Sequence, residues 1–296
     1  MSGDDNEQFR LDKGRVRRGF EQAATTYDNA AVLQREVAAR VIDRFELIRV
    51  QPKRILDVGA GTGAMLPDLM KRFPKAEIVA LDPAVAMLRR ARRRGRWLCR
   101  PLSVCGDGEH LPFRTGSFDL VISNLTLHWL NDPERAFREF LRVLEPEGLL
   151  LFSTLGPDTL QELRQSWAEV DAYNHVNAFM DMHDLGDALV RTQFADPVMD
   201  MESFTLTYGS VSDLMRDLKH LGGRNATQGR PRGLTGRNRL RQMEQAYERW
   251  RTPSDVLPAT FEVIYGHAWA PAQRPQRRDS SGAVSVPLSS IGRRGA

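Results

Sequence analysis

A short apolar segment that runs into three glycines constrains this chain more than any other feature. The segment "ILDVGAGTG" begins at Ile55 and contains Gly59, Gly61 and Gly63. Its apolar residues indicate a buried strand, and glycines at the turn into a following helix let the backbone approach a ligand closely. Strand and helix patterns then alternate as far as Leu155. This alternation predicts an α/β fold with a parallel sheet covered by helices on both faces.

Three acidic residues near the ends of successive predicted strands narrow the choice of ligand. Asp57 precedes the glycines, Asp82 ends "IVALD", and Asp107 follows in "CGDGEH". The spacing G-x-G-x-G differs from the G-x-G-x-x-G of dinucleotide enzymes, and a carboxylate at this turn suits a cation better than a pyrophosphate. Asp82 is placed to hold ribose hydroxyls, and Asp107 to receive an adenine amino group. An adenosine with a charged amino-acid tail and no phosphate is S-adenosylmethionine (AdoMet).

Residues 50 to 156 resemble motifs I to III of class I AdoMet-dependent methyltransferases. The resemblance implies a Rossmann-like seven-stranded sheet, with the usual strand order 3-2-1-4-5-7-6. It also implies that Asn124, at the end of the fourth strand, faces the reacting methyl group. A nucleotide site or a relic without cofactor is the alternative. The cofactor-binding residues that we expect are Asp57, Gly59, Gly61, Gly63, Asp82, Asp107, Gly108, Asn124 and Gln34.

The remaining sequence predicts extensions to a single methyltransferase domain over residues 15–269. Residues 15–50 resemble the helical lid of small-molecule AdoMet enzymes, in which Tyr27 and Gln34 would close over the cofactor. Tyr27 as a packing aromatic is an equal alternative. Residues 211–251 form a basic helical insertion between the last two strands. We expect residues 1–14 to be flexible, and the Pro-, Ser-, Gly- and Arg-rich tail 270–296 to be disordered.

Positive charge is concentrated in two runs, although the formal net charge is only +4. Residues 89–100 carry seven arginines, and "LGGRNATQGRPRGLTGR" (221–237) carries four arginines, five glycines and no carboxylate. Such runs suit a carboxylate, a phosphate, an acidic protein or nucleic acid, or are simply solvated surface. We expect no nucleic acid, because the chain has neither an appended RNA-binding module nor interleaved aromatic and basic residues.

The sequence after the fourth strand bears on the methyl acceptor. An acceptor needs a general base only if it carries its proton, and a carboxylate, with a pKa near ~4, does not. "SNLTLHW" stands where nucleobase and amide methyltransferases have an "NPPY"-type tetrad. The pattern favours an acidic acceptor, with no general base and no metal.

Four C-terminal blocks resemble the malonyl-acyl-carrier-protein O-methyltransferases of biotin synthesis, the BioC family. They are "LLFSTLGPDTLQELRQSW", "VDAYNHVNAFMDMHDLGDAL", "LKHLGGRNATQGRPRGLTGR" and "LPATFEVIYGHAW". The match runs from Phe20 to Trp269, with Ala60 where many members have Cys. It implies positioning roles for Tyr27, Asn124 and His128. The substrate-binding residues that we expect are Trp129, His175, Arg224, Arg230, Arg232, Arg237 and His267.

This resemblance implies that AdoMet methylates the free carboxylate of malonyl-acyl-carrier protein or malonyl-CoA. The methyl ester would start pimeloyl synthesis for biotin, and an acidic carrier protein would be the partner. Three alternatives remain: a protein arginine hydroxylase or respiratory-complex assembly factor with the same fold, an RNA methyltransferase, and an AdoMet-gated binding protein without turnover.

The cysteine content and the hydropathy of the chain indicate its cellular compartment. Cys99 and Cys105 are the only cysteines and are not spaced as a metal pair, which favours a reducing compartment. The N-terminal residues offer no signal-peptide pattern, and no run of about 18 apolar residues predicts a membrane span. We expect a cytoplasmic protein.

Overall fold

The computed structural model describes residues 7–95, 100–231, 233 and 235–273, and its seven-stranded sheet has the predicted order β3-β2-β1-β4-β5-β7-β6. Neighbours from β3 to β5 pair in parallel, and β7 is antiparallel to both β5 and β6. The predicted α/β class is therefore confirmed. The strands are β1 Arg54–Val58, β2 Glu77–Asp82, β3 Leu102–Cys105, β4 Phe118–Ser123, β5 Leu144–Leu155, β6 Ala195–Tyr208 and β7 Leu257–Trp269.

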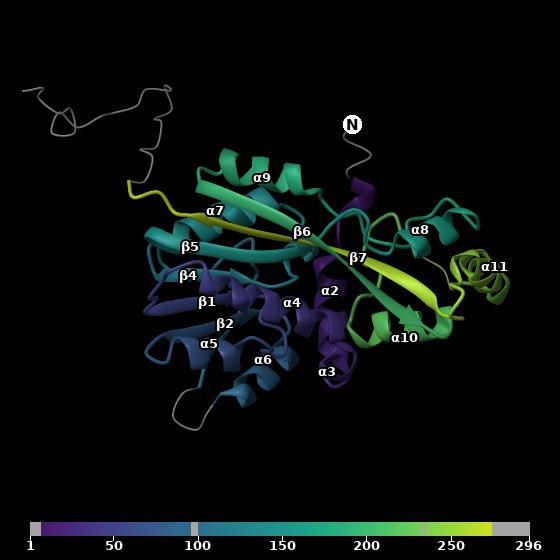
Figure 1. Ribbon diagram of the computed structural model, residues 1–296, viewed down its shortest axis with the longest axis horizontal. Coiled ribbons are helices and arrows are strands. Elements are labelled where there is room, and N and C mark those ends of the chain that lie inside the picture. The colour runs from purple at the N-terminus through teal and green to yellow at the C-terminus, as the bar shows by residue number, and fades with distance from the viewer. Residues whose placement is uncertain (1–6, 96–99, 232, 234, 274–296) are drawn as a thin grey trace, which may run out of the picture.

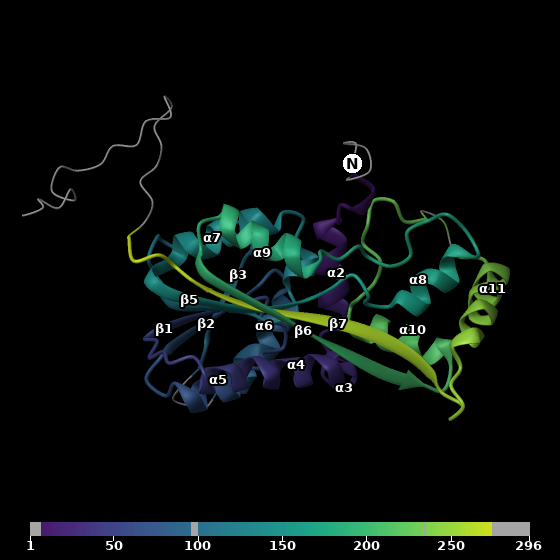
Figure 2. The same cartoon turned by 45° about the horizontal axis from the view of Figure 1, so that its top comes forward.

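Helices cover both faces of the sheet, because alternate residues of each buried strand face opposite sides. In β1, Ile55 packs with α4 (Val32–Asp43) and α5 (Leu66–Arg72), while Leu56 packs with α7 (Pro133–Val143) and α9 (Met182–Arg191). Figure 2 shows α7 and α9 above the sheet, with α4 and α5 below it. Helix α6 (Val85–Ala91) lies next to β2 and β3.

The strands β6 and β7 extend beyond β5 and carry a second lobe (Figure 1). Their pairing continues from Ala195 and Trp269 to Tyr208 and Leu257. Around the projecting end lie α8 (Gln161–Ala168), α10 (Val211–His220) and α11 (Arg237–Tyr247). Apolar residues of all three helices belong to the same core cluster as Ile55. The lobe therefore shares its core with the sheet.

The helical regions outside the sheet consist of short segments. The N-terminal region, expected to be a helical lid, comprises α2 (Lys13–Ala23), α3 (Tyr27–Ala30) and α4. Helix α8 ends at Ala168, and Asp171 forms a local turn after it, accepting hydrogen bonds from Tyr173 N and His175.

The segment that we expected to be flexible, residues 1–14, is held in place over its described part. Leu11 is buried, and its backbone exchanges two hydrogen bonds with the Asn131 side chain. It also forms an antiparallel bridge with Thr227 in the basic insertion. Most of the 270–296 tail lies outside the described residues. No described helix is both long and apolar enough to cross a membrane.

Candidate functional site

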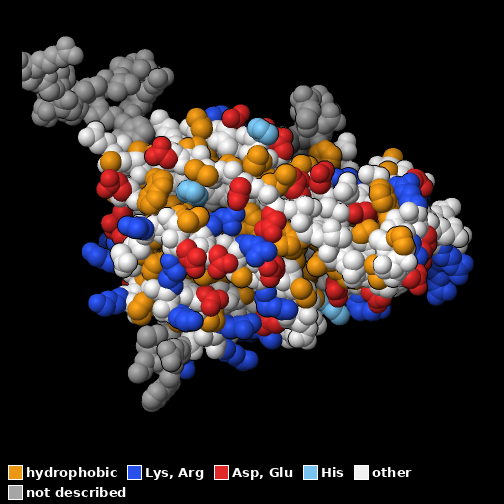
Figure 3. Space-filling model, in the orientation of Figure 1, with side chains coloured by type: hydrophobic (Ala, Val, Ile, Leu, Met, Phe, Trp, Pro, Cys, Tyr) orange, Lys and Arg blue, Asp and Glu red, His pale blue; other side chains and the backbone are white. Residues whose placement is uncertain are grey.

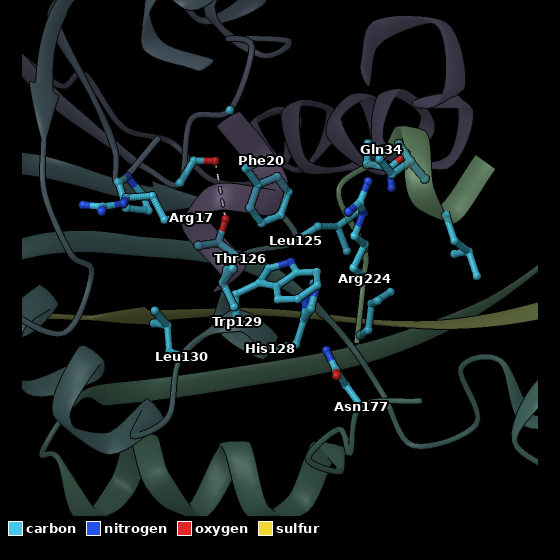
Figure 4. Close-up of a pocket in the computed structure, with 18 of the residues that line it drawn as sticks. Arg17, Phe20, Gln34, Leu125, Thr126, His128, Trp129, Leu130, Asn177 and Arg224 are labelled. Carbon is cyan, nitrogen blue, oxygen red and sulfur yellow. Dashed lines mark hydrogen bonds between the residues drawn. The ribbon is translucent and has the colours of Figure 1, made fainter. Parts of the chain in front are cut away.

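A cavity of about 940 Å³ opens at the carboxyl ends of β1, β2, β4 and β5 (Figure 4). The sheet supplies its floor, α2 to α4 cover it, and the second lobe closes its far side. It brings together most of the predicted site residues, from segments far apart in the sequence. These are Tyr27, Gln34, Gly59, Gly61, Asp82, Asp107, Gly108, Asn124, His128, Trp129, His175 and Arg224.

The glycine turn after β1 forms one wall of this cavity. Gly59, Gly61 and Gly63 all have positive φ angles, of 74°, 54° and 78°, a conformation that favours glycine. Gly59 and Gly61 line the cavity, but Gly63 does not. A Cβ at Gly63 would lie 2.9 Å from the Ala91 Cα. Gly63 therefore permits close packing against α6, and its expected contact with the ligand is not supported.

Replacing Gly59 with alanine is expected to destabilise the fold by about 2–5 kcal/mol. The estimate combines a left-handed backbone cost of roughly 1–2 kcal/mol with roughly 1–3 kcal/mol for overpacking. The added Cβ would meet the Thr126 Oγ1 at 2.1 Å. Thermal unfolding would measure the loss. The control is Gly236→Ala, since a Cβ at Gly236 meets nothing within 4 Å; equal melting temperatures for the two variants would contradict the argument.

Asp82 lies on the cavity wall at the end of β2. Its Oδ2 accepts a hydrogen bond from Gly61 N at 3.0 Å, and its Oδ1 accepts one from Ala84 N at 2.7 Å. Burial raises the pKa of Asp82 to about 6, although these two hydrogen bonds act in the opposite direction. The carboxylate thus fixes the glycine turn and retains lone pairs for a hydroxyl ligand.

Asp57 lies behind the glycine turn and does not itself line the cavity. It is 1% exposed, and its Oδ1 has no hydrogen-bond partner in the described structure. Burial and the neighbouring charge of Asp82 raise the pKa of Asp57 to about 7. A buried carboxylate is costly unless a cation or hydrogen-bond donors compensate it. The wall at this point therefore favours a positively charged ligand group.

An acidic cluster at the edge of the cavity is neutralised by a lysine. Ligand atoms of Asp107, Glu109 and His110 lie within 4.8 Å of one another, as in a metal site. However, the Lys13 Nζ lies 2.5 Å from Asp107 Oδ2 and 2.6 Å from Glu109 Oε2. Burial raises the pKa of Asp107, but the hydrogen bonds from Lys13 and Glu109 N outweigh it and lower the pKa overall. The Lys13 ammonium thus supplies positive charge here, and the expectation that no metal is used stays a prediction.

The far half of the cavity is aromatic and holds a neutral histidine. Burial lowers the pKa of His128 to about 3, and its Nδ1 lies 3.4 Å from the Thr154 hydroxyl. The His128 ring meets Phe179 edge-on at 5.8 Å, and Trp129 meets Phe20 in the same way at 5.2 Å. His128 can therefore hydrogen-bond a ligand at neutral pH but cannot act as a base of useful strength.

Between the two halves lie the residues expected to position the reaction. The Asn124 Oδ1 accepts a 2.7 Å hydrogen bond from the Ser153 hydroxyl, which fixes its amide. Burial, with Asp82 and Asp28 nearby, raises the pKa of Tyr27, so its phenol remains protonated. The Gln34 Oε1 is buried and without a partner in the part of the chain described. These groups place hydrogen-bonding atoms around the region where the two halves of the cavity meet.

The four candidate arginines of the insertion have different positions. Arg224 lines the cavity mouth and forms no ion pair with a described residue. Arg230 binds the Thr227 carbonyl oxygen at 2.7 Å instead. Arg237 is exposed at the start of α11 and does not line the cavity. Arg232 lies outside the described residues.

The two other candidate histidines, His175 and His267, also differ in position relative to the cavity. His175 lines the cavity, where it stacks on Trp167 at 3.7 Å and pairs with Asp171 at 2.8 Å. His267 does not line it. It lies within β7 opposite Leu151 and Val198, so the expected substrate contact is not supported.

Sequence reasoning missed several residues that line the cavity. Lys13, Arg17 and Phe20 project from α2, and their spacing of three to four residues places them on one helical face. That spacing was a detectable signal. Asn177 lies in the irregular segment between α8 and α9, where no periodicity marks a functional residue.

Comparisons with known proteins agree with this geometry. Residues 56–152 match the family described as Methyltransferase domain. A protein from Bacillus halodurans C-125, assigned as a methyltransferase, has the same fold with a TM-score of 0.56 and 17% identity. The match covers 79% of this chain and 98% of that one. Fold and site together define a class I methyltransferase.

Curated proteins are much more similar in sequence. The malonyl-[acyl-carrier protein] O-methyltransferase of Halorhodospira halophila (strain DSM 244 / SL1) is 51% identical over 285 residues, covering 96% of this chain and 97% of that protein. Its namesake from Laribacter hongkongensis (strain HLHK9) is 53% identical over 284 residues, covering 93% and 95%. The chain belongs to the malonyl-[acyl-carrier protein] O-methyltransferase family.

Proposed function

We propose that this enzyme transfers the methyl group of AdoMet to the free carboxylate of a malonyl thioester carried by an acyl-carrier protein. One observation carries the proposal: a single cavity joins a nucleoside-type half to an acceptor half that holds an arginine and a histidine of very low basicity. Asp82 marks the first half, and Arg224 with neutral His128 marks the second. The curated relatives carry the name of this reaction.

The residues present fit AdoMet. Buried Asp57 lies behind the glycine turn, and the charge of its unpartnered carboxylate would attract the methionine ammonium across that turn rather than by direct contact. Gly59 and Gly61 leave space for the methionine, and Asp82 can accept both ribose hydroxyls. Gly108 lines the cavity beside Asp107, where the adenine would lie. When bound, AdoMet supplies an electrophilic methyl group on a sulfonium.

The acceptor half suits a carboxylate nucleophile. A carboxylate oxygen forms the new bond to the methyl carbon as the carbon–sulfur bond breaks, and the electron pair of that bond stays on sulfur. The negative charge of the carboxylate and the positive charge of the sulfonium disappear together, so no proton moves. Protonated Tyr27 and neutral His128 are consistent with a site that positions the reactants and excludes water rather than acting as a base.

The carrier protein is the proposed source of the malonyl group, with malonyl-CoA as an alternative carrier of the same thioester. Figure 3 shows Lys and Arg side chains gathered over α11, where the sequence places Arg237, Arg239 and Arg241. This charge suits an acidic carrier.

We propose that the segment 15–50 acts as the lid over the cofactor. We also propose that 211–251 is the insertion that faces the carrier protein, and that the reaction takes place in the cytoplasm.

Transfer of labelled methyl from AdoMet to malonyl-carrier protein tests the function, with acetyl- and succinyl-carrier protein as controls. We expect base-labile label on the malonyl form alone, since a carboxyl methyl ester is hydrolysed by base. Label on none of the carriers, with AdoMet still bound, would refute the proposed reaction. Label on the succinyl form to the same extent would refute malonyl specificity.

AdoMet affinity should depend on pH through Asp57. Its pKa of about 7 means that the free enzyme is partly protonated at neutral pH. A cation binds the ionised form, so we expect weaker binding as the pH falls from 8 to 5.5, approaching about tenfold per pH unit below the pKa. Calorimetry in two buffers of different ionisation enthalpy should detect proton release at pH 6.5. Asp57→Asn should reduce that release; an unchanged value would exclude Asp57 as its source.

A further inference from the structure

A second cavity, of about 500 Å³, adjoins the central one on the side of α8. Its lining comes mainly from the end of α8 and from the irregular segment that follows, residues 171–179. The volume lies in the range of small-molecule sites. Five residues line both cavities: Trp167, His175, Val176, Asn177 and Phe179. The second cavity is therefore a direct neighbour of the acceptor half.

Two exposed aromatic side chains lie at this second cavity. Phe9 is 39% exposed and Tyr173 is 52% exposed, and both line it. The backbone beside the Tyr173 ring is fixed, because Tyr173 N donates to Asp171 Oδ1 at 3.0 Å and the Asn174 carbonyl oxygen accepts a hydrogen bond from the Asn225 side chain. Exposed apolar side chains gathered at a cavity typically mark a binding surface. The two rings therefore offer apolar contact to a ligand in the second cavity.

The segment shared by the two cavities has peptide groups without partners in the protein. Within residues 175–179, no backbone N–H or C=O forms a hydrogen bond with another described residue. The segment is nevertheless held in place, since His175 stacks on Trp167 with an interplanar angle of 6° and Phe179 meets His128 edge-on. Peptide groups in a fixed segment need partners from a ligand or from water. These groups suit a ligand that itself contains amides.

The second cavity lies between the basic helix α11 and the acceptor half. Arg239 of α11 is 3.6 Å from the Asp171 carboxylate, and Asp171 lines this cavity. Helices α8 and α11 lie side by side in the second lobe (Figure 2). The exposed arginines of α11 are those that would face an acidic carrier protein. An arm that starts at a carrier on α11 would therefore pass through the second cavity before its malonyl end reaches His128.

We propose that the second cavity binds the pantoyl and β-alanine part of the phosphopantetheine arm. The gem-dimethyl group of that part suits the rings of Phe9 and Tyr173, and its amide suits the free peptide groups of residues 175–179. The inference rests on the proposed function, since it assumes a malonyl thioester in the acceptor half. In this arrangement the second cavity makes the enzyme selective for pantetheine-type thiols over shorter ones.

Two thioesters that differ in length test the proposal. Malonyl-pantetheine carries the pantoyl and β-alanine groups, and malonyl-N-acetylcysteamine ends just after the cysteamine amide. We expect the wild-type enzyme to prefer malonyl-pantetheine by about tenfold or more in kcat/KM, because binding of the remote part of a substrate contributes to its transition-state stabilisation. The double variant Phe9→Ala, Tyr173→Ala should reduce this preference to within about threefold of unity, since the longer substrate then loses its apolar contacts.

Lys219→Ala is the control. Lys219 is exposed and lines the central cavity but not the second one, so it lies on the alternative way in for the arm. This variant should retain the tenfold preference. AdoMet binding and the melting temperature report whether each variant is folded. If the double variant fails this check, Tyr173→Ala takes its place and should reduce the preference at least about threefold.

The outcomes separate this inference from the function. Equal kcat/KM for the two thioesters in the wild-type enzyme, or a preference that survives the loss of the rings, would overturn the role of the second cavity and leave the methyltransferase reaction intact. A preference lost in Lys219→Ala instead would place the arm at the mouth of the central cavity and also overturn the inference. Absence of methyl transfer to every malonyl thioester, including the carrier-bound form, would overturn the proposed function and this inference with it.

Discussion

Replacing Asp82 with asparagine is expected to weaken AdoMet binding by about 10²–10⁴-fold. A hydrogen bond to a charged group contributes roughly 1.5–3 kcal/mol, and two ribose hydroxyls would donate to this carboxylate. Their combined loss, roughly 3–6 kcal/mol, corresponds to that range in dissociation constant. Asp82 is 7% exposed, so solvent offers little compensation.

Asparagine cannot reproduce the present arrangement even though it has the same shape. Both Asp82 oxygens already accept a backbone hydrogen bond, one from Gly61 and the other from Ala84. An amide has one acceptor oxygen and one NH₂ group, so one of these backbone N–H groups would face another donor. The substitution therefore disturbs the glycine turn as well as the ribose contact.

Asp119→Asn is the matched control for this prediction. The Asp119 Oδ2 also accepts two backbone hydrogen bonds, from Lys53 N at 3.0 Å and Arg54 N at 2.8 Å, but at the opposite ends of the strands. It should lower the melting temperature without changing the AdoMet dissociation constant measured by calorimetry. A similar loss of affinity in both variants would mean that Asp82 acts only through stability.

The sheet and the cofactor half could be predicted because their signals are local in sequence. Alternating strand and helix patterns determine a parallel sheet, and parallel strands bring their carboxyl ends to one edge. Asp82 and Asn124, each at the end of its strand, therefore had to meet there. For Gly63 the sequence alone leaves the role open, since a glycine motif does not distinguish contact with a ligand from close packing against Ala91.

The acceptor half could not be predicted in the same way, because it is assembled from distant segments. Asn177 precedes α9, Arg224 follows α10, and Phe20 lies in α2. Only tertiary packing brings the three to one cavity. Proximity in sequence was also misleading: Arg237 is close to Arg224 along the chain, yet it begins α11 on the outside of the second lobe.

The position of Arg224 makes it the arginine from which we expect the largest effect on the acceptor. Figure 4 shows Arg224 and Gln34 directed into the same cavity as His128. No described acid pairs with Arg224, so its guanidinium is available for a carboxylate. A planar guanidinium binds a carboxylate through two parallel hydrogen bonds, and this geometry would orient one oxygen for in-line attack.

Arg224→Met should therefore lower kcat/KM for the malonyl thioester by about 10²-fold, since loss of one partner of a ligand charge pair costs roughly 2–5 kcal/mol, discounted here for exposure at the cavity mouth. AdoMet affinity should stay within about twofold, because the cofactor contacts lie in the other half. Arg237→Met removes an equal charge from the same insertion, outside the cavity, and should change kcat/KM for a small malonyl thioester without carrier protein by less than about threefold. Steady-state kinetics on the malonyl-N-acetylcysteamine thioester, which has no carrier surface, separates binding of the carboxylate from binding of the carrier. Equal losses in the two variants with carrier-bound substrate, and none with the small thioester, would assign Arg224 to carrier docking and leave the carboxylate to His128 and the hydrogen-bonding groups around it.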